Sequence, residues 1–416
     1  MGFKNEASSS SNSIPRTAHS ESAPLLNTHG PITLSSQPKT FANVFIAIVG
    51  AGVLGLPYAF KRTGWAAGTV IILAIGVLTY HCMMLLVRTR RRLERDIGFA
   101  QIASFGDLGR AVAGPTGRLA VDSMIVLSQA GFCIGYLIFI SSTLAQLFPN
   151  PKSLYILAVF PFQLALNSIQ SLTLLAPLSI FANIVDIVAM GTVIREDVVA
   201  GARYWLDLKA FGGPSEILYG FGVAVFSFEG MGMVLPLESE AADKGQFGRT
   251  IGLSMGVISF IYVAFGALGY AAFGAETHDI ITTNLSGGAV AVAVQVGLCI
   301  NLFFTFPVMM NPVYEVVERL ACGKRYCVWL RWAVVTAVSL VALLVPNFTD
   351  FLSLVGSSVC CVLGFVLPAS FHLRVFWSEM GRLGVAFDGA IILSGVILAV
   401  SGTYTSIMAI FCSVQL

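Results

Sequence analysis

Eleven apolar stretches, each long enough to cross a lipid bilayer as a helix, follow one another along this chain of 416 residues. A bilayer core of about 30 Å needs about 20 apolar residues in a helix. Hydrophobic residues make up 56% of the chain and charged residues 11%, which excludes an ordinary soluble protein of this length. The segments are 41–60, 65–88, 119–147, 153–170, 174–194, 215–236, 249–273, 289–313, 327–345, 350–373 and 386–412. The sequence therefore predicts an all-α polytopic membrane protein with 11 transmembrane helices, surrounded by membrane lipid.

The Lys and Arg residues predict which side of the membrane each loop faces. Eighteen of the 24 fall in the N-terminal tail and in loops that would share one side. The densest cluster is Arg88, Arg90, Arg91, Arg92 and Arg95. Because basic loops stay in the cytoplasm, the N-terminus is predicted to be cytosolic and the C-terminus luminal. Two glycosylation patterns, starting at Asn284 and Asn347, fall on the luminal side, although Asn347 is better explained as a turn or helix-capping residue.

Residues 1–39 are rich in Ser, Pro, Thr and Asn and contain no apolar run, which predicts a disordered cytoplasmic tail. The tail has no apolar core of a secretory signal peptide. Within it, Glu21, Leu25 and Leu26 match the acidic dileucine signals that sorting adaptors bind. A chance match explains this short pattern equally well, so both interpretations stay open.

Two of the apolar segments are interrupted in the same way, 180 residues apart, by Gly50–Pro57 and by Gly230–Pro236. A Gly-rich run that ends in Pro cannot continue an ordinary helix, so backbone N–H and C=O groups are freed at bilayer depth. Such backbone persists only where protein or a polar cavity surrounds it. Matching interruptions in two halves of a chain are typical of the substrate site of a transporter.

The interruptions also predict the domain organisation. Five segments start from each of them, which gives a first repeat at 41–194 and a second at 215–373. Five is an odd number, so the second repeat begins on the opposite side of the membrane and the repeats are inverted. The transporter domain then covers 40–412, with 386–412 as an extra helix outside the symmetry.

Several other classes of function are disfavoured by the residues. The eight cysteines show no zinc-type spacing, so packed, reduced thiols and no metal site are expected. The sequence lacks a basic face with interleaved aromatic residues, so nucleic-acid binding is not expected. Gly252–Gly256 fits the pattern around a hydrolase nucleophile, but it lies within an apolar helix, where small-residue helix packing explains it better. An enzyme is therefore not expected.

A broken helix offers partners for both charges of a zwitterionic ligand, one that has a carboxylate and an ammonium group. Freed N–H groups carry about half a positive charge, and freed carbonyls attract an ammonium group. We expect the carboxylate on the amides of Gly50, Ala51, Gly52 and Val53. The ammonium is expected near the carbonyls of Ile46, Phe226 and Ser227, with Phe228 and Gly230 in the same second wall. The competing interpretation is a close helix crossing of the GxxxG kind.

Further polar residues in the apolar segments are candidates for coupling or for lining a cavity. Glu229 lies inside the second interruption, where it is either a protonatable coupling group or a neutral carboxyl that satisfies freed backbone donors. Asp186, three residues from Asn183, is the second coupling candidate. Predicted cavity-lining residues are Gln129, Phe132 and Gly135, together with Asn301 and Thr305. Asp122, Glu238 and Glu240 are instead expected in interfacial ion pairs.

The two interruptions carry a resemblance to a known family. Gly50-Ala-Gly-Val-Leu-Gly-Leu-Pro-Tyr-Ala-Phe60 with Gly64-Trp65, and Phe226-Ser-Phe-Glu-Gly-Met-Gly-Met-Val-Leu-Pro-Leu-Glu238, resemble the amino acid and auxin permease family. With Asn301–Pro307 and Pro346–Phe351, the chain is most similar to that family's plant vacuolar-membrane transporters of neutral and aromatic amino acids. The resemblance covers about 40–412.

This resemblance implies the five-plus-five fold of the bacterial leucine transporter and proton-coupled transport of amino acids without another cofactor. Sodium-using members carry an Asn at the position of Ile46, so sodium is the less expected coupling ion. Export from an acidic vacuolar lumen to the cytosol is the implied direction. An amino-acid sensor with little net flux, and an importer in the plasma membrane or an endosomal membrane, remain as alternatives.

Overall fold

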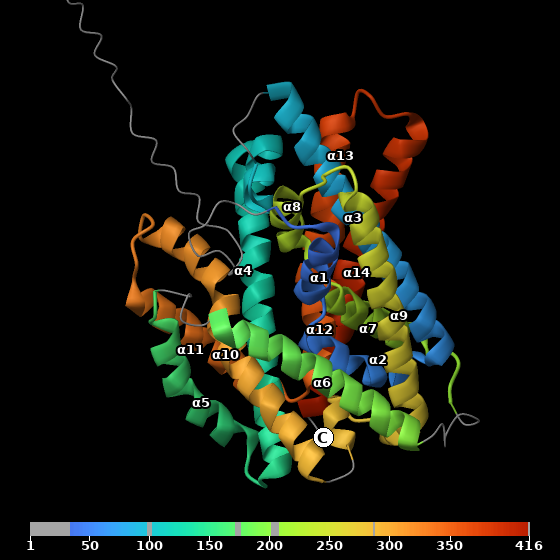
Figure 1. Cartoon of the computed structure of the whole chain (residues 1–416), viewed down its shortest axis with the longest axis vertical. Coiled ribbons are helices and arrows are strands. Elements are labelled where there is room, and N and C mark those ends of the chain that lie inside the picture. The colour runs from blue at the N-terminus through green and yellow to red at the C-terminus, as the bar shows by residue number, and fades with distance from the viewer. Residues whose placement is uncertain (1–33, 98–101, 171–175, 201–207, 286–287, 415–416) are drawn as a thin grey trace, which may run out of the picture.

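The computed structural model describes residues 34–97, 102–170, 176–200, 208–285 and 288–414. In these residues the regular structure is helical, apart from one isolated bridge between Ser35 and Ala241 (Figure 1). The predicted sorting residues Glu21, Leu25 and Leu26 lie outside the described residues. Residues 34–39, which the sequence assigned to the tail, are ordered, because the first helix already begins at Gln37.

The first half of the chain holds the first interrupted helix and four further helices. Its elements are α1 (Gln37–Ile48), the 3₁₀ turn η1 (Ala51–Gly55), α2 (Leu56–Thr63), α3 (Trp65–Ile97), α4 (Phe105–Leu147), α5 (Lys152–Asn167) and α6 (Ala176–Ala200). The axis bends by 51° between Gln37–Ile48 and Ala51–Thr63. In α4, non-helical backbone at Ala113 and Gly114, just before Pro115, separates a short first part from the predicted segment that follows.

The second half repeats this order and adds one helix. Its elements are α7 (Pro214–Ser227), α8 (Met231–Glu240), α9 (Phe247–Phe273), η4 (Gly274–Glu276), η5 (Ile281–Asn284), α10 (Ala289–Ala321), α11 (Val328–Leu344), α12 (Phe348–Val355), the π-helical segments η6 (Gly356–Cys360) and η7 (Val362–Val366), α13 (Leu367–Phe376) and α14 (Arg382–Val414). The π-helical turns inside the tenth segment were not predicted. α14 packs at the periphery, with only 17% of its most apolar stretch buried.

Each of the eleven predicted segments coincides with a helix or an interrupted helix. Among the described residues, seven helices are long and apolar enough to cross a membrane, or eight if the bent pair at Gln37–Thr63 counts as one span. α5 and α11, of 16 and 17 residues, are shorter than this criterion requires. The all-helical architecture is therefore as predicted, and the number of eleven crossings stays a prediction.

Contacts between loops sort them into the two predicted sets. On the basic face, Arg92 at the end of α3 pairs with Glu379 beyond α13, and Arg319 of α10 pairs with Asp122 of α4. Arg91 also donates to the Lys244 carbonyl, in the α8–α9 connection, at 2.5 Å. On the opposite face, the connections that were predicted to be luminal contact one another. Lys61 Nζ donates to the Thr277 carbonyl at 2.9 Å, and Lys152 Nζ donates to the Pro346 carbonyl at 2.8 Å. The Gly212 amide donates to the Thr63 carbonyl at 2.6 Å.

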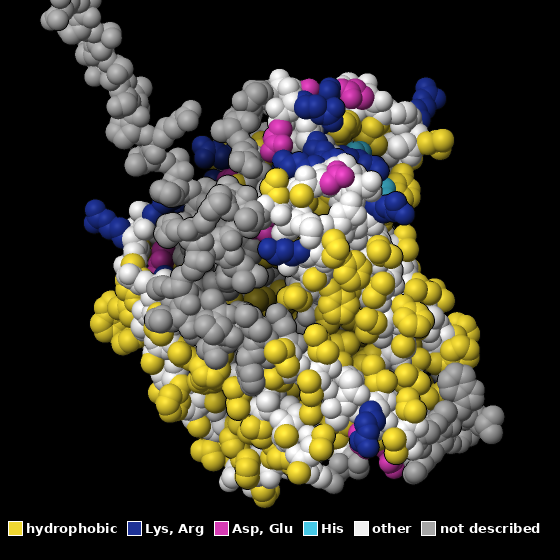
Figure 2. All heavy atoms as spheres, in the orientation of Figure 1, with side chains coloured by type: hydrophobic (Ala, Val, Ile, Leu, Met, Phe, Trp, Pro, Cys, Tyr) yellow, Lys and Arg dark blue, Asp and Glu magenta, His cyan; other side chains and the backbone are white. Residues whose placement is uncertain are grey.

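The surface between these two faces is apolar. Figure 2 shows hydrophobic side chains over the middle of the visible surface, with Lys, Arg, Asp and Glu gathered toward one end. Large exposed apolar residues occur on α3, α9 and α14, among them Val77, Phe260 and Val400, which are 70%, 72% and 69% exposed. The apolar surface seen in this view suits contact with lipid.

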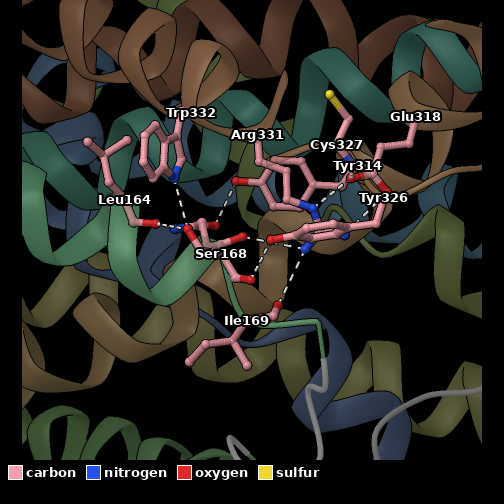
Figure 3. A network of polar contacts seen from close by, with 10 residues as sticks. Leu164, Ser168, Ile169, Tyr314, Glu318, Tyr326, Cys327, Arg331 and Trp332 are labelled. Carbon is pink, nitrogen blue, oxygen red and sulfur yellow. Dashed lines mark hydrogen bonds and ion pairs between the residues drawn. The ribbon is translucent and has the colours of Figure 1, made fainter. Parts of the chain in front are cut away.

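A buried polar network joins the ends of α5, α10 and α11 (Figure 3). Arg331 Nε and Nη2 donate to the two carboxylate oxygens of Glu318, at 2.7 and 3.2 Å. The guanidinium lies between two rings, 4.7 Å from the centre of Tyr314 and 4.6 Å from that of Tyr326. The Tyr314 hydroxyl in turn donates to Asn167 Oδ1 at 2.7 Å. The ion pair is thus hydrogen-bonded and covered by aromatic rings, the condition under which a buried charge is tolerated.

Candidate functional site

The two helix interruptions lie next to each other at the centre of the fold. Ser227 Oγ, at the end of α7, donates to the Gly52 carbonyl in η1 at 3.3 Å. The hydroxyl of Tyr262, from α9, lies 2.9 Å from the Ser227 carbonyl and 3.4 Å from the Ile48 carbonyl. One buried tyrosine hydroxyl therefore lies between a carbonyl of the first interrupted helix and a carbonyl of the second.

The freed amides on the first wall are fewer than the four predicted. The Val53 N–H already donates to the Gly50 carbonyl at 3.2 Å, inside the 3₁₀ turn, so Val53 does not offer a free donor in this conformation. Within the described part of the chain, the amides of Gly50, Ala51 and Gly52 have no such hydrogen bond. Gly50 is extended, with φ of −146°, and a Cβ atom there would meet nothing within 4 Å. The backbone at Gly50 therefore has open space beside it, and the binding of a carboxylate there stays a prediction.

The carbonyls predicted to bind the ammonium group are partly engaged. The Phe226 carbonyl accepts the Glu229 N–H at 3.2 Å, and the Ser227 carbonyl accepts from Tyr262. Each has a second lone pair that could accept from a ligand. The Ile46 side chain is 46% exposed and points away from the core, so only its backbone remains a candidate.

Aromatic rings enclose the site. Phe132 of α4 packs edge-on against Phe226, with ring centres 4.9 Å apart, and Phe228 lies 5.0 Å from the ring of Tyr262. Phe132 thus lies where the sequence predicted it. Gly230 packs closely on the first wall, because a Cβ atom there would lie 2.9 Å from the Ile48 side chain. Gln129 and Gly135 of α4, which were also predicted to line the cavity, have no described contact with the interruptions. Gln129 is half-buried, and Gly135 faces α12.

Glu229 lies in the second interruption, as predicted, and acts on the backbone there. Its Oε1 accepts the Met231 N–H, at 3.2 Å, at the start of α8. A carboxyl in this position satisfies a freed donor at a helix N-terminus. The structure therefore shows the backbone-satisfying role, which is compatible with a coupling role for the same group.

A second polar group lies between α6 and α10. Asn301 Nδ2 donates to Asp186 Oδ1 at 2.8 Å, and Thr305 Oγ1 donates to Asn301 Oδ1 at 3.0 Å. The structure thus joins three predicted residues into one hydrogen-bonded chain, but this chain runs between α6 and α10 rather than across the broken helices. The side chain of Asn183 lies outside the described residues.

Contacts that the sequence did not reveal join neighbouring segments on both sides of the interruptions. On one face, Asp350 Oδ1 of α12 accepts from the Tyr219 hydroxyl at 2.9 Å and lies 3.4 Å from Arg62 Nη1, while the Arg62 guanidinium covers the Tyr219 ring at 4.0 Å. In the sequence, the signal for this contact was the charge of Arg62, just beyond the first interruption, and of Asp350, at the start of the tenth segment. The residues next to them do not indicate that these two charges pair.

On the basic face, the chain before α1 is bonded to the end of α8. The Ser35 N–H donates to the Glu240 carbonyl at 2.8 Å, and the Ala242 N–H donates to the Ser35 carbonyl at 3.0 Å. Glu238, fully buried, pairs with Arg90 at 2.5 Å and Arg91 at 2.6 Å, which agrees with its predicted role in an ion pair. These contacts hold together the half-helices that lead to the two interruptions.

A family model described as "Transmembrane amino acid transporter protein" matches residues 34–408. This chain belongs to that family. It is 61% identical to "Amino acid transporter AVT3C" of Arabidopsis thaliana over 435 residues, which cover 99% of each chain. It is 27% identical to "Vacuolar amino acid transporter 3" of Schizosaccharomyces pombe, over 90% of this chain and 61% of that one. The family predicted from the sequence is thus confirmed, and with it a multi-pass amino acid transporter.

Solved structures confirm the fold class. The transporter MhsT, solved in complex with L-phenylalanine, is similar with a TM-score of 0.55 and 13% identity, over 91% of this chain and 100% of that one. Mhp1, a nucleobase-cation-symport-1 family transporter solved in a closed conformation, is similar with a TM-score of 0.54 and 15% identity, over 92% and 93%. At these identities the likeness concerns the fold alone, which is the predicted leucine-transporter-like architecture.

The glycines of the first interruption provide a direct test of the site. A Cβ atom at Gly52 would lie 3.0 Å from a ring carbon of Phe226 and 3.3 Å from the Ser227 backbone, whereas at Gly50 it would meet nothing within 4 Å. We expect Gly52→Ala to lower transport about tenfold and to lower the melting temperature, because the two walls must separate. Gly50→Ala is expected to keep the wild-type melting temperature and to raise the substrate concentration for half-maximal flux. Wild-type values for Gly52→Ala would contradict this arrangement.

Proposed function

We propose that this chain is a proton-coupled transporter, not an enzyme, that moves neutral and aromatic amino acids across the vacuolar membrane from the lumen to the cytosol. The observation that carries the proposal is the adjacency of the two interruptions, bridged by Tyr262. The amides of one broken helix and the carbonyls of the other therefore lie close to each other. This arrangement suits the two opposite charges of an amino acid.

The vacuolar membrane and the class of substrate rest on the relatives. One is named a vacuolar amino acid transporter, and two others are named amino acid transporters of Arabidopsis thaliana. The cytosolic N-terminus rests on the basic loops, which lie together on one face. Sorting adaptors that bind the tail through Glu21, Leu25 and Leu26 are part of the proposal for how the chain reaches the vacuole.

Proton coupling is favoured by two carboxyl groups, one in the second interruption and one between α6 and α10. Asp186 and Glu229 each have a neutral hydrogen-bond partner, Asn301 for one and the Met231 backbone for the other, and neither forms an ion pair in the described part of the chain. A carboxyl without a cationic partner in a membrane can gain or lose a proton as its surroundings change. One pH unit corresponds to about 1.4 kcal/mol, so two units support roughly a hundredfold gradient at one proton per substrate.

The test is a flux measurement with purified protein in liposomes loaded with labelled phenylalanine or alanine. We expect an acid interior to accelerate release, a protonophore to abolish the acceleration, and replacement of sodium by choline to have no effect. Binding without gradient-driven flux would favour the alternative of a sensor. A sodium requirement would overturn the proposed coupling ion, and a fluorescent fusion at the plasma membrane would overturn the proposed location.

The same assay assigns the coupling group. We expect Glu229→Gln or Asp186→Asn to lower acid-driven release about tenfold while leaving exchange at equal pH within about twofold, because exchange needs no net proton movement. Glu276→Gln, at an exposed position outside the site, serves as the matched control. If a variant behaves like Glu276→Gln in both acid-driven release and exchange, the substituted residue takes no part in proton coupling.

A further inference from the structure

Two cysteines lie at opposite ends of the turn between α10 and α11. Cys322 directly follows the last residue of α10, and Cys327 directly precedes the first residue of α11. Gly323 and Lys324, between them, have φ of +59° and +66°, and the Arg325 N–H donates to the Cys322 carbonyl at 3.2 Å. Two successive residues with positive φ reverse the chain in a tight turn of the I′ kind. The turn folds the second cysteine back toward the first.

Glu318 holds both cysteines in place. Its carbonyl accepts the Cys322 N–H at 2.9 Å, and its Oε1 accepts the Cys327 N–H at 3.3 Å. Figure 3 shows Cys327 beside Glu318 at the edge of the Arg331 network. The two cysteines interact through their side chains, and neither is bridged. Two neighbouring thiols at the ends of one tight turn, anchored by one residue, are arranged for reaction with each other.

The pair differs from the other cysteines that the structure describes. Cys82, Cys133, Cys299, Cys360 and Cys361 are buried, whereas Cys322 and Cys327 are both half-exposed and unbridged. The described residues contain no group of three or more His, Cys, Asp or Glu side chains that could hold a metal ion. A redox reaction between the two thiols therefore suits this site better than metal binding.

We propose that Cys322 and Cys327 form a redox site that hydroperoxides convert reversibly to a disulfide, and that the disulfide slows transport. In the first step, a thiolate attacks the peroxide, which breaks the O–O bond, forms a sulfenic acid and releases hydroxide or, from an organic peroxide, an alkoxide. In the second, the other thiol attacks the sulfenic sulfur and water leaves. Two thiols are thus oxidised by two electrons, the peroxide is reduced, and a dithiol reductant reverses the reaction.

The surroundings of the turn support this chemistry. Lys324 and Arg325 lie within the turn and are exposed, so the two cysteines flank a loop that peroxides can reach. Desolvation and the neighbouring Cys327 raise the pKa of Cys322, so Cys322 keeps its proton and suits the second step. If this face is cytosolic, the pair is reduced at rest and oxidised only transiently.

The disulfide would act on transport through Glu318 and α10. Bonding brings the sulfur atoms to about 2.05 Å, which draws Cys327 toward Cys322 and away from the Glu318 carboxylate. Glu318 pairs with Arg331 in the network that joins α5, α10 and α11. The cross-link therefore restrains the end of α10, the helix that carries Asn301 and Thr305. This inference does not depend on the coupling ion or on the amino acid transported.

Trypsin provides a direct readout of the bond, because it cleaves after Lys324 and Arg325, between the cysteines. After treatment of the full-length protein with hydrogen peroxide, we expect peptides 320–324 and 326–331 to be recovered as one disulfide-linked species, two hydrogen masses below their sum. Dithiothreitol is expected to separate them. Recovery of the two peptides unlinked, with separate oxidised thiols, would overturn the proposal.

The effect on transport is measured in the same liposomes. Peroxide is expected to slow labelled amino acid flux several-fold in the wild type, with recovery after dithiothreitol. Cys322→Ser and Cys327→Ser are expected to keep their flux in peroxide, whereas the matched variant Cys299→Ser, which removes a buried cysteine of the same helix, is expected to respond as the wild type does. The regulatory role would be overturned if peroxide slowed flux in Cys322→Ser and Cys327→Ser as much as in the wild type. It would also be overturned if the wild type formed the disulfide without any change in flux.

Discussion

Gly356→Ala is expected to abolish transport and to lower the melting temperature of the purified protein more than the other substitutions of single glycines suggested above. A Cβ atom at Gly356, the first residue of η6, would lie 1.9 Å from the Gly222 carbonyl oxygen and 2.9 Å from the Phe226 amide nitrogen. Both atoms belong to the backbone of α7, so no side chain can turn away to make room. Overpacking costs about 1–3 kcal/mol and occasionally more, and here it moves the residues that enter the second interruption.

The matched control lies in the same π-helical stretch. A Cβ atom at Gly364 would meet nothing within 4 Å, so Gly364→Ala changes helix propensity in the same way without the clash. We expect Gly364→Ala to keep the flux and the melting temperature of the wild type. Similar behaviour of the two variants in the liposome assay and in thermal unfolding would refute the close approach of α7 and η6.

Arg331→Met is expected to be among the most destabilising changes of a charged residue, with a loss of about 3–5 kcal/mol, because it leaves the Glu318 carboxylate buried without its partner. Arg331 and Glu318 have side chains that are only 9% and 11% exposed. The same substitution at Arg195, which forms an exposed pair with Glu196 and is itself 69% exposed, is the control and is expected to cost less than about 1 kcal/mol. Thermal unfolding in detergent measures both.

A double substitution separates the charge from the packing. Glu318→Leu combined with Arg331→Met removes both charges, and we expect it to recover much of the stability lost in Arg331→Met, since an apolar pair replaces an ion pair with little net cost. A double variant that is as unstable as the sum of the two single variants would show that the network acts through packing of Tyr314 and Tyr326 instead.

Much of the fold could be predicted from the sequence because its signals are local. Hydropathy over about 20 residues placed eleven segments, each of which coincides with a helix or an interrupted helix. Gly50 and Gly230 marked the two interruptions, because the loss of helical hydrogen bonds depends on the residues at that position themselves. The spacing of the interruptions also indicated the inverted repeat. The π-helical turns of η6 and η7 carried no such signal.

The sequence located the two interruptions, whereas the substrate site expected between them stays a prediction. Phe132 was expected near the interruptions and packs against Phe226 there. The prediction of a free Val53 amide was wrong for this conformation, because the 3₁₀ turn uses that donor internally. Tyr262 was not foreseen, since an aromatic residue in an apolar helix is more often part of the core. Its role depends on two carbonyls from other helices.

By itself, the sequence determined that this chain is an all-helical membrane protein with two broken helices, because hydropathy and helix breaking act within one segment of chain. Only the tertiary structure decided which groups meet. It joined Asp186 to Asn301, Arg62 to Asp350 and Arg331 to Glu318, pairs that are 115, 288 and 13 residues apart along the chain. A polar side chain in an apolar helix must find a partner, and the residue that becomes its partner is set by how the helices pack.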